Sequence, residues 1–388
     1  MHELPIYLDH AATALLDPAV AAVMSACLAD EVGYGNPSTY AHAHGRRAAA
    51  RIEAARADVA ALIGAPAAAI LFTSGATESD NLAVLGAARA NAARGKTHVI
   101  TARTEHKAVL AACEQLEREG LRVSYLTPAK TGVVSADAVA AAVTPETGLV
   151  ALMLVNNETG VLQDIAAVGA LTRERGILLH VDAVQAVGHL PVDVEALGAD
   201  LLALSAHKLH GPTGVGALYV RRSPRPALVP LAFGGGHEQG LRPGTLSVHQ
   251  IAGFGEACRL ARERLPVEAP RQRALTDRLW GRLATLDGAT RNGAGAPLAP
   301  HILSVTFAAV DGEALRFGLA GLAVSGGSAC GSSSGEPSYV LRALGRSDPE
   351  AVATIRFSVG CQTTEADIDA AADAVQAEYE RLRALAPR

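Results

Sequence analysis

Up to about residue 245, the chain alternates short apolar runs with longer amphipathic stretches. The apolar runs are rich in Val, Ile and Leu and predict β-strands at 69–74, 98–103, 122–127, 149–155, 177–183, 201–206 and 216–221. Alanine-rich stretches between several of them predict helices at 76–94, 106–119 and 164–175. Strands that alternate with helices form parallel sheets with helical crossovers. We therefore predict an α/β domain built on a mainly parallel seven-stranded sheet.

The remaining third of the chain has a different pattern. It predicts a long helix at 247–286 and two further helices, at 312–320 and from about 364. Strands are predicted at 301–310 and 354–360, and a loop at 291–300. We interpret this part as a smaller α+β domain of residues 261–388, with residues 1–15 packed alongside it. Residues 16–260 then form the large domain, a division that the chain length allows.

Composition excludes several classes of protein. The 388 residues carry a formal net charge of −5, so no basic excess suggests a nucleic-acid partner. No apolar run approaches the length of a membrane span, and the N-terminus lacks the features of a secretory signal. The five cysteines form no CxxC pair, which argues against a disulfide framework and a zinc site. His42 and His44, in AHAHG, find no matching ligand cluster, and we expect them in a polar loop. We expect a cytoplasmic protein without a metal.

Lysine is rare, since only four of the 34 basic residues are lysines. Lys96, Lys107 and Lys130 lie in turns or at a helix start and are most simply solvated. Lys208 differs, because it follows the apolar run LLALSA directly. The carboxyl ends of parallel strands are where open α/β sheets bind ligands, and a lysine desolvated there becomes nucleophilic. A lysine that merely ends a strand is the alternative.

Two further features complement this lysine. Asp182 ends another apolar strand, three residues before Gln185, and Ala76 and Thr77 begin a helix after the strand–turn segment ILFTSG. A Schiff-base lysine, a carboxylate for a pyridinium nitrogen, and a helix N-terminus for a phosphate are what pyridoxal phosphate (PLP) requires. An acidic turn and simple helix capping are the alternatives. Together these features favour a PLP site.

One cysteine lies in an unusual stretch. Cys330 is flanked on both sides by five residues that are all Gly, Ser or Ala, in SGGSACGSSSG. Such composition is typical of a flexible, solvated segment, whereas a structural cysteine normally has apolar neighbours. We interpret Cys330 as a reactive thiol on a mobile arm, with a plain loop as the alternative. The other cysteines, Cys27, Cys113, Cys258 and Cys361, are expected to be structural.

Ten motifs, in order along almost the whole chain, carry a family resemblance. They are YLDHAAT, GNPS, FTSGATESDNLA, TEHKAV, VNNETGVLQDI, HVDAVQAVG, SAHKLHGPTGVGALYVRR, GGGHEQGLRPGT, SGGSACGSSSGEPSYVLRALG and IRFSVG. In these motifs the chain resembles the cysteine desulfurases of the class V aminotransferase group, in particular the IscS/NifS-like type. The resemblance implies the type I fold of PLP-dependent transferases.

The resemblance also assigns roles to individual residues. It implies that Lys208 forms the Schiff base, that Asp182 pairs with the ring nitrogen, and that Gln185 lies near the phenolic oxygen. It implies that His106 stacks on the ring and carries protons. The remaining roles are phosphate contacts for Ala76, Thr77, Ser205 and His207, a phosphate contact from the other subunit for Thr245, and substrate binding for Asn157, Arg356 and Asn36.

By the same resemblance, Cys330 takes the sulfur of L-cysteine as a persulfide and leaves L-alanine. The implied partners are a second copy of the chain and a sulfur acceptor such as an iron–sulfur scaffold protein. Iron–sulfur cluster assembly is the expected destination of the sulfur, with tRNA thiolation as another. A selenocysteine lyase-like enzyme and a non-catalytic PLP-binding protein are the rivals. A dinucleotide oxidoreductase is disfavoured, because the glycine-rich stretch GPTGVG precedes a strand and not a helix.

Overall fold

The computed structural model describes residues 4–29, 34–326 and 336–385. Its main element is a seven-stranded sheet in the order β2 (Ile70–Thr73), β8 (Gly216–Val220), β7 (Leu201–Ser205), β6 (Leu178–Asp182), β5 (Thr147–Met153), β3 (His98–Ala102) and β4 (Arg122–Leu126). β8 runs in the opposite direction to the other six strands. The α/β fold and all seven predicted strands are confirmed, with ends shifted by a few residues.

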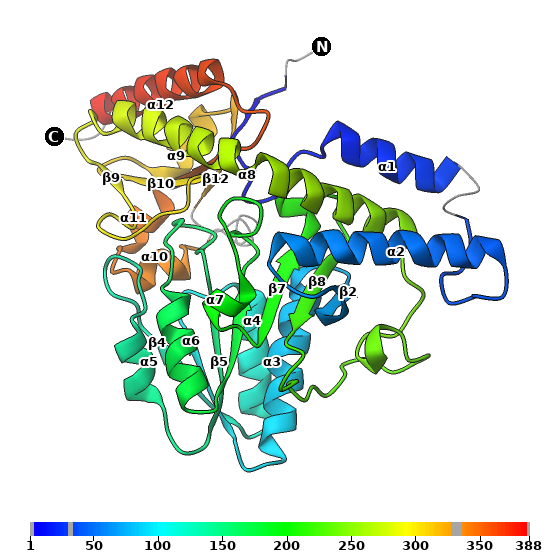
Figure 1. Ribbon diagram of the computed structural model, residues 1–388. Coiled ribbons are helices and arrows are strands. Elements are labelled where there is room, and N and C mark those ends of the chain that lie inside the picture. Colours follow the sequence, from blue (N-terminus) through cyan, green and yellow to red (C-terminus); the bar gives the residue numbers. More distant parts are fainter. Residues whose placement is uncertain (1–3, 30–33, 327–335, 386–388) are drawn as a thin grey trace.

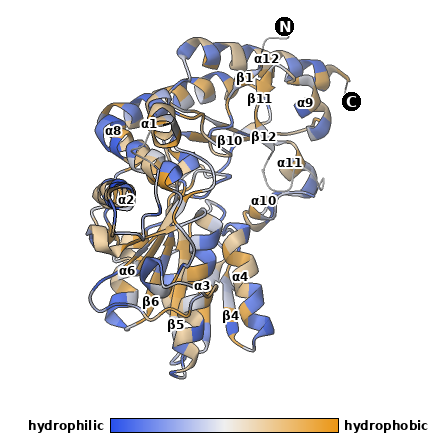
Figure 2. Cartoon of the chain, turned by 90° about the vertical axis from the view of Figure 1, so that its right-hand side faces the viewer, coloured by the Kyte–Doolittle hydropathy of each residue, from blue (hydrophilic) through white to orange (hydrophobic). Residues whose placement is uncertain are grey.

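Helices cover both faces of this sheet. Alternate strand residues point to opposite faces, so Ile70 and Phe72 join one apolar cluster while Leu71 joins another. The Leu71 face is covered by α3 (Ala76–Ala92) and α4 (Lys107–Arg118). The other face is covered by α1 (Pro18–Ala29), α2 (Ala43–Leu62), α5 (Ala136–Ala142), α6 (Ile165–Glu174), α7 (Val194–Leu197) and the first half of α8 (Val248–Leu283). Figure 2 shows the resulting apolar strands β5 and β6 between helices of mixed hydropathy.

A second, antiparallel sheet lies at the other end of the molecule (Figure 1). Its order is β12 (Ser325–Gly326), β13 (Thr354–Ser358), β10 (Ile302–Phe307) and β9 (Ala289–Arg291). Around it lie α9 (Gly312–Gly318), α10 (Tyr339–Ala343), α11 (Asp348–Val352) and α12 (Glu365–Leu385). The N-terminal strand β1 (Ile6–Tyr7) pairs in parallel with β11 (Leu322–Ala323), so the chain start lies beside this smaller part.

One long helix joins the two parts. Helix α8 (Val248–Leu283) contributes its first half to the cluster under the large sheet and its second half, from Leu275, to the cluster of the small part. The predicted boundary between residues 260 and 261 falls inside this helix and stays a prediction. No helix among the described residues has the length and apolarity to cross a bilayer.

The sequence patterns did not reveal the helices at the chain start, α1 (Pro18–Ala29) and α2. The expected polar loop at 41–45 is wrong, because the His42 side chain accepts a hydrogen bond from the backbone N–H of Gly45 and caps α2, which begins at Ala43. A side-chain acceptor at this position satisfies a backbone donor of the first helical turn.

Candidate active site

A cavity of about 560 Å³ opens where β6 and β7 end. Ten of the predicted site residues line it: Ala76, Thr77, His106, Asn157, Asp182, Gln185, Ser205, His207, Lys208 and Arg356. They come from widely separated parts of the chain. The fold therefore brings together most of the side chains that sequence reasoning singled out, at the carboxyl edge of the sheet where ligands bind.

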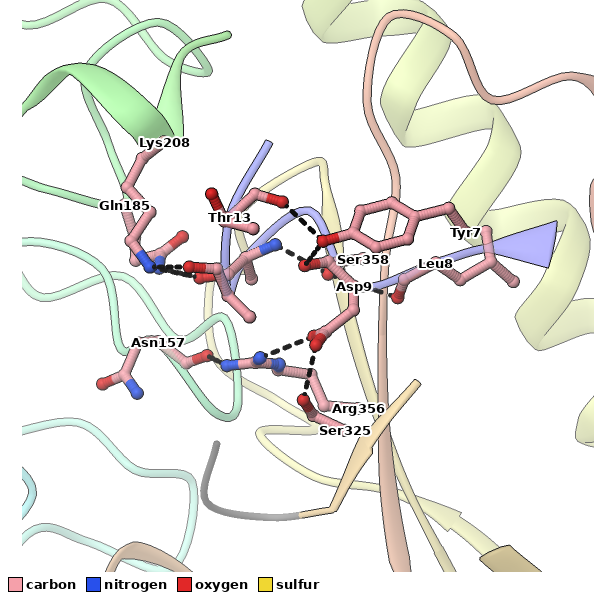
Figure 3. Close-up of polar contacts among 12 residues, drawn as sticks. Tyr7, Leu8, Asp9, Thr13, Asn157, Gln185, Lys208, Ser325, Arg356 and Ser358 are labelled. Atoms are coloured by element: carbon pink, nitrogen blue, oxygen red, sulfur yellow. Dashed lines mark hydrogen bonds and ion pairs between the residues drawn. The ribbon is translucent and has the colours of Figure 1, made fainter. Parts of the chain in front are cut away.

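Lys208 lies at the end of a short 3-10 turn, η2 (Ala206–Lys208), that follows β7 directly. Its Nζ atom donates to the backbone oxygens of Ala11 (2.8 Å) and Ala12 (2.6 Å). The Ala11 oxygen also accepts a hydrogen bond of 2.9 Å from Nε2 of Gln185 (Figure 3). The amine thus lies on the cavity wall and is held there by main-chain oxygens. A pattern of residue types cannot predict these contacts, because every residue has such an oxygen.

Asp182, the last residue of β6, lies in a buried acidic environment. Its Oδ1 accepts a hydrogen bond of 3.0 Å from the backbone of Val184. Burial, and then the nearby carboxylate of Asp80, raise its pKa to about 6. Asp80, also in the cavity wall, lies 3.0 Å from Nε2 of the buried His180. A positively charged ring nitrogen beside Asp182 would offset the repulsion between the Asp182 and Asp80 carboxylates. Sequence reasoning missed Asp80, whose only signal is its place on the first turns of α3.

The start of α3 provides space and donors for an anion. Gly75 precedes the helix at φ +152°, and a Cβ atom there would meet no atom within 4 Å. Free backbone N–H groups at the start of a 17-residue helix favour a phosphate. His207 lies on the same cavity, with Nδ1 3.1 Å from Oγ1 of Thr13. Burial, together with the Lys208 charge, lowers the His207 pKa to about 4, so His207 is neutral at pH 7.

His106 has two roles in the structure. Its Nδ1 accepts a hydrogen bond of 3.2 Å from the backbone of Ala108, which caps α4. A neutral ring that accepts at Nδ1 carries its proton at Nε2. The ring also lines the cavity. His106 therefore both caps helix α4 and presents its ring to the cavity.

Arg356, on β13, has only 1% of its side chain exposed. Its Nη1 donates to the backbone oxygen of Asn157 (2.6 Å) and its Nη2 to Oδ1 of Asp9 (2.8 Å). Oδ2 of Asp9 accepts a further hydrogen bond of 2.8 Å from Ser325 (Figure 3). Within the described ranges, Nε of Arg356 and Oδ1 of Asn157 are buried without a hydrogen-bond partner. These two atoms are suited to a ligand carboxylate or amine.

Two of the predicted residues that the structure describes are not brought to the cavity. Thr245 and Asn36 are exposed and do not line it. They belong to neighbouring surface segments, since Oγ of Ser38 lies 3.0 Å from Nε2 of His237. Cys330 lies outside the described residues. Of the other cysteines, Cys27, Cys113 and Cys258 are buried and Cys361 is half-buried.

The cavity fits PLP, the cofactor that the resemblance implies. The open space above Gly75 at the start of α3 suits a phosphate, the buried Asp182 suits a ring nitrogen, and the Lys208 amine suits an aldehyde. Among the described residues, no group of three His, Cys, Asp or Glu side chains is arranged to hold a metal ion.

Comparisons with known proteins agree with this geometry. The family "Aminotransferase class-V" matches residues 6–371. Cysteine desulfurase IscS of Salmonella schwarzengrund strain CVM19633 is 51% identical over 385 residues, which cover 99% of this chain and 95% of the relative. The Aeromonas hydrophila protein of the same name is 52% identical with the same coverage.

Solved structures point the same way. A structure described as "NIFS-LIKE PROTEIN" has a TM-score of 0.89 and 34% identity, and the match covers 98% of this chain and 100% of that one. A structure described as "SspA in complex with cysteine" has a TM-score of 0.81 and 39% identity, covering 91% and 98%. Because both the fold and near-complete sequence matches agree, this chain belongs to the class-V aminotransferase family and, within it, to the PLP-dependent cysteine desulfurases.

Proposed function

We propose that this cysteine desulfurase takes sulfur from L-cysteine in the cavity described above and passes it to Cys330 as a persulfide. The observation that supports the proposal best is the convergence of three side chains on one cavity: Asp182 from the end of β6, Lys208 from just after β7, and Arg356 from the middle of β13. An amine, a buried carboxylate and a guanidinium in one site match a cofactor with a ring nitrogen and an amino-acid substrate with a carboxylate.

Each group has a distinct task in the proposal. Bound PLP supplies an electron sink for the negative charge that develops at Cα of the substrate. Asp182 favours the protonated ring nitrogen, and the N–H groups of Ala76 and Thr77 with Ser205 and His207 hold the phosphate. With PLP bound, Gln185 would donate to the phenolic oxygen, and His106 would lie against the ring and move protons through its Nε2 atom. The Lys208 amine would hold the aldehyde between turnovers and, while it is not bonded to the aldehyde, would take the Cα proton.

The substrate side depends on Arg356 and Asn157. A guanidinium can bind a carboxylate through two parallel hydrogen bonds, which fixes the orientation of the amino acid as well as its position. The buried Nε of Arg356 and Oδ1 of Asn157 offer one donor and one acceptor. We assign Asn36 to substrate binding, and Thr245 to the phosphate of the partner subunit in a homodimer.

Sulfur transfer to Cys330 balances without an external oxidant. The Cys330 thiolate attacks the substrate sulfur, an S–S bond forms, and the C–S bond breaks with its electron pair on the carbon fragment. That fragment takes up one proton at Cβ, balancing the one that the Cys330 thiol lost, regains at Cα the proton that Lys208 removed, and becomes alanine. We assign the sulfur to an acceptor protein for iron–sulfur cluster assembly. The cytoplasmic location, the homodimer and tRNA thiolation stay predictions.

The test compares alanine and sulfide released from L-cysteine and a reductant by the wild type, Cys330→Ala and Cys361→Ala. Burial raises the pKa of the Cys361 thiol to about 11, so its thiolate is scarce at neutral pH and its loss should change little. We expect Cys330→Ala to keep the colour of bound PLP but release neither product. Full activity of Cys330→Ala would instead favour a selenocysteine lyase-like enzyme. A protein that PLP cannot reconstitute would refute the site assignments.

A further inference from the structure

The N-terminal segment 9–13 crosses the cavity between the two parts of the molecule. It follows β1, and in Figure 3 it lies between the small sheet and the Lys208 side of the site. Leu8, the residue before the segment, is joined to the small part by backbone hydrogen bonds to the Ala323 oxygen (2.9 Å) and from Ser358 (2.7 Å), and the His10 N–H donates to the Ser358 oxygen (3.5 Å). The segment is therefore anchored beside strands β11 and β13.

The same five residues touch four predicted site residues. Asp9 pairs with Arg356, and Thr13 contacts His207. Between them, the Ala11 oxygen accepts from both Lys208 and Gln185, and the Ala12 oxygen accepts from Lys208. An ammonium group has three donors, and two of those of Lys208 end on this segment. The position of the amine is thus set by the main chain of 9–13.

One buried side chain fixes that main chain. Ser358 is fully buried on β13, and its Oγ accepts a hydrogen bond of 2.8 Å from the backbone N–H of Ala11. Ala11 therefore carries both the N–H that Ser358 holds and the C=O that holds Lys208. The N–H and C=O of Ala11 belong to the two peptide planes that meet at its Cα, so loss of the Ser358 oxygen releases the first plane and lets the dihedral angles that orient the second plane relax. At the other end of the segment, the Tyr7 hydroxyl donates to the Thr13 oxygen at 2.8 Å.

We propose that residues 9–13 form an acceptor clamp that holds the Lys208 amine whenever it makes no covalent bond, and that Ser358 is the positioning residue that sets this clamp. The inference rests on the proposed role of Lys208. An amine that must return to the same place in every turnover gains from a fixed position, since displacement by about 1 Å can cost about 100-fold in rate. The clamp also couples Lys208 to the small sheet, because Ser358 and Arg356 lie on one strand.

The first test uses the cofactor-free protein and its four lysines. Reductive methylation with formaldehyde and cyanoborohydride is followed by mass spectrometry at Lys208, with Lys96, Lys107 and Lys130 as internal standards. We expect Ser358→Ala to speed labelling of Lys208 several-fold and leave the standards unchanged. Ser358→Thr, which keeps the oxygen, should restore protection.

Two matched variants make the result decisive. Ser304 is a buried serine on the neighbouring strand β10 whose Oγ accepts from Asn292 (3.1 Å), so Ser304→Ala should leave Lys208 labelling unchanged. If Ser358→Ala speeds labelling of all four lysines, the chain has loosened as a whole, and Tyr7→Phe decides in its place. The clamp is overturned if Lys208 is labelled at the wild-type rate in Ser358→Ala, or in Tyr7→Phe where that variant takes its place.

The second test uses the PLP-loaded enzyme. For Ser358→Ala we expect kcat with L-cysteine to fall about tenfold while KM stays within twofold, because the substrate contacts are unchanged. Unchanged kcat together with unchanged labelling refutes the positioning role. If the wild type releases no alanine from L-cysteine but Lys208 protection still depends on Ser358, the proposed function fails and the clamp stands.

Discussion

The ion pair between Asp9 and Arg356 allows a quantitative test of how the substrate side of the cavity is built. Asp9→Ala removes the carboxylate that Nη2 of Arg356 donates to at 2.8 Å. It leaves the guanidinium buried, with only the Asn157 oxygen as a described partner. A buried charge that loses its counter-charge is strongly destabilising, so the variant should lose much of the stability of this region.

The structure sets the expected size of the effect. Two unit charges about 4 Å apart attract by roughly 4 kcal/mol at an effective dielectric near 20, and breaking a buried pair costs about 3–5 kcal/mol. We expect about 3 kcal/mol, the lower end, because the Asp9 side chain keeps 19% of its surface exposed and water already shares its charge. With about 2.1 cal/mol/K of unfolding entropy per residue, this corresponds to a fall in Tm of about 4 °C for the 388 residues.

The assay is thermal and urea unfolding of the cofactor-free protein in a double-mutant cycle. Arg356→Met keeps the volume of the side chain and removes its charge. We expect Asp9→Ala to cost less free energy of unfolding in the Arg356→Met background, by about 1–3 kcal/mol, because no buried charge is then left unpaired. Ser325→Ala, which removes only the donor to Oδ2 of Asp9, should cost about 1.5 kcal/mol, the lower end for a hydrogen bond to a charged group. Additive losses for Asp9 and Arg356 would refute the reasoning.

Two further predictions concern cofactor affinity and pH. Gly75→Ala should weaken PLP binding at least tenfold in an absorbance titration, because a methyl group then occupies the space at the start of α3. The control is Gly95→Ala, a substitution at an equally open position (φ +79°) away from the cavity, which should bind PLP normally. Equal losses of PLP affinity in the two variants would contradict the phosphate site. Burial, and then the Arg122 charge, lower the pKa of His98 in the folded protein to about 4, from its usual 6.5. As pH falls from about 6.5 towards 4, His98 therefore binds a proton in the unfolded chain but not in the folded protein, and the free energy of unfolding decreases. The urea midpoint of His98→Gln should therefore fall less between pH 7 and 4.5 than that of the wild type, and equal falls would contradict this pKa assignment.

Helix α2 shows where sequence patterns were insufficient for the fold. Of its nine buried residues, five are Gly or Ala and one is Arg, so the spacing of large apolar residues is weak here. The helix is fixed by close approach to α8, where a Cβ on Gly255 would lie 2.6 Å from Cβ of Ala55. Small residues allow that contact, but only the folded chain shows which helix approaches.

The sequence by itself determined the strands and most of the site. Nearly continuous apolar runs set the seven strands, because a sheet buried on both faces needs apolar side chains at successive positions. Chemically distinctive side chains such as Lys208 and Asp182 mark the strand ends. Only the tertiary structure decided how the site is held. The Ala11 and Ala12 carbonyls carry no residue signature, and Asp9 meets Arg356 across 347 positions of sequence. Such contacts depend on how two sheets are placed against each other, and local patterns contain no information about that placement.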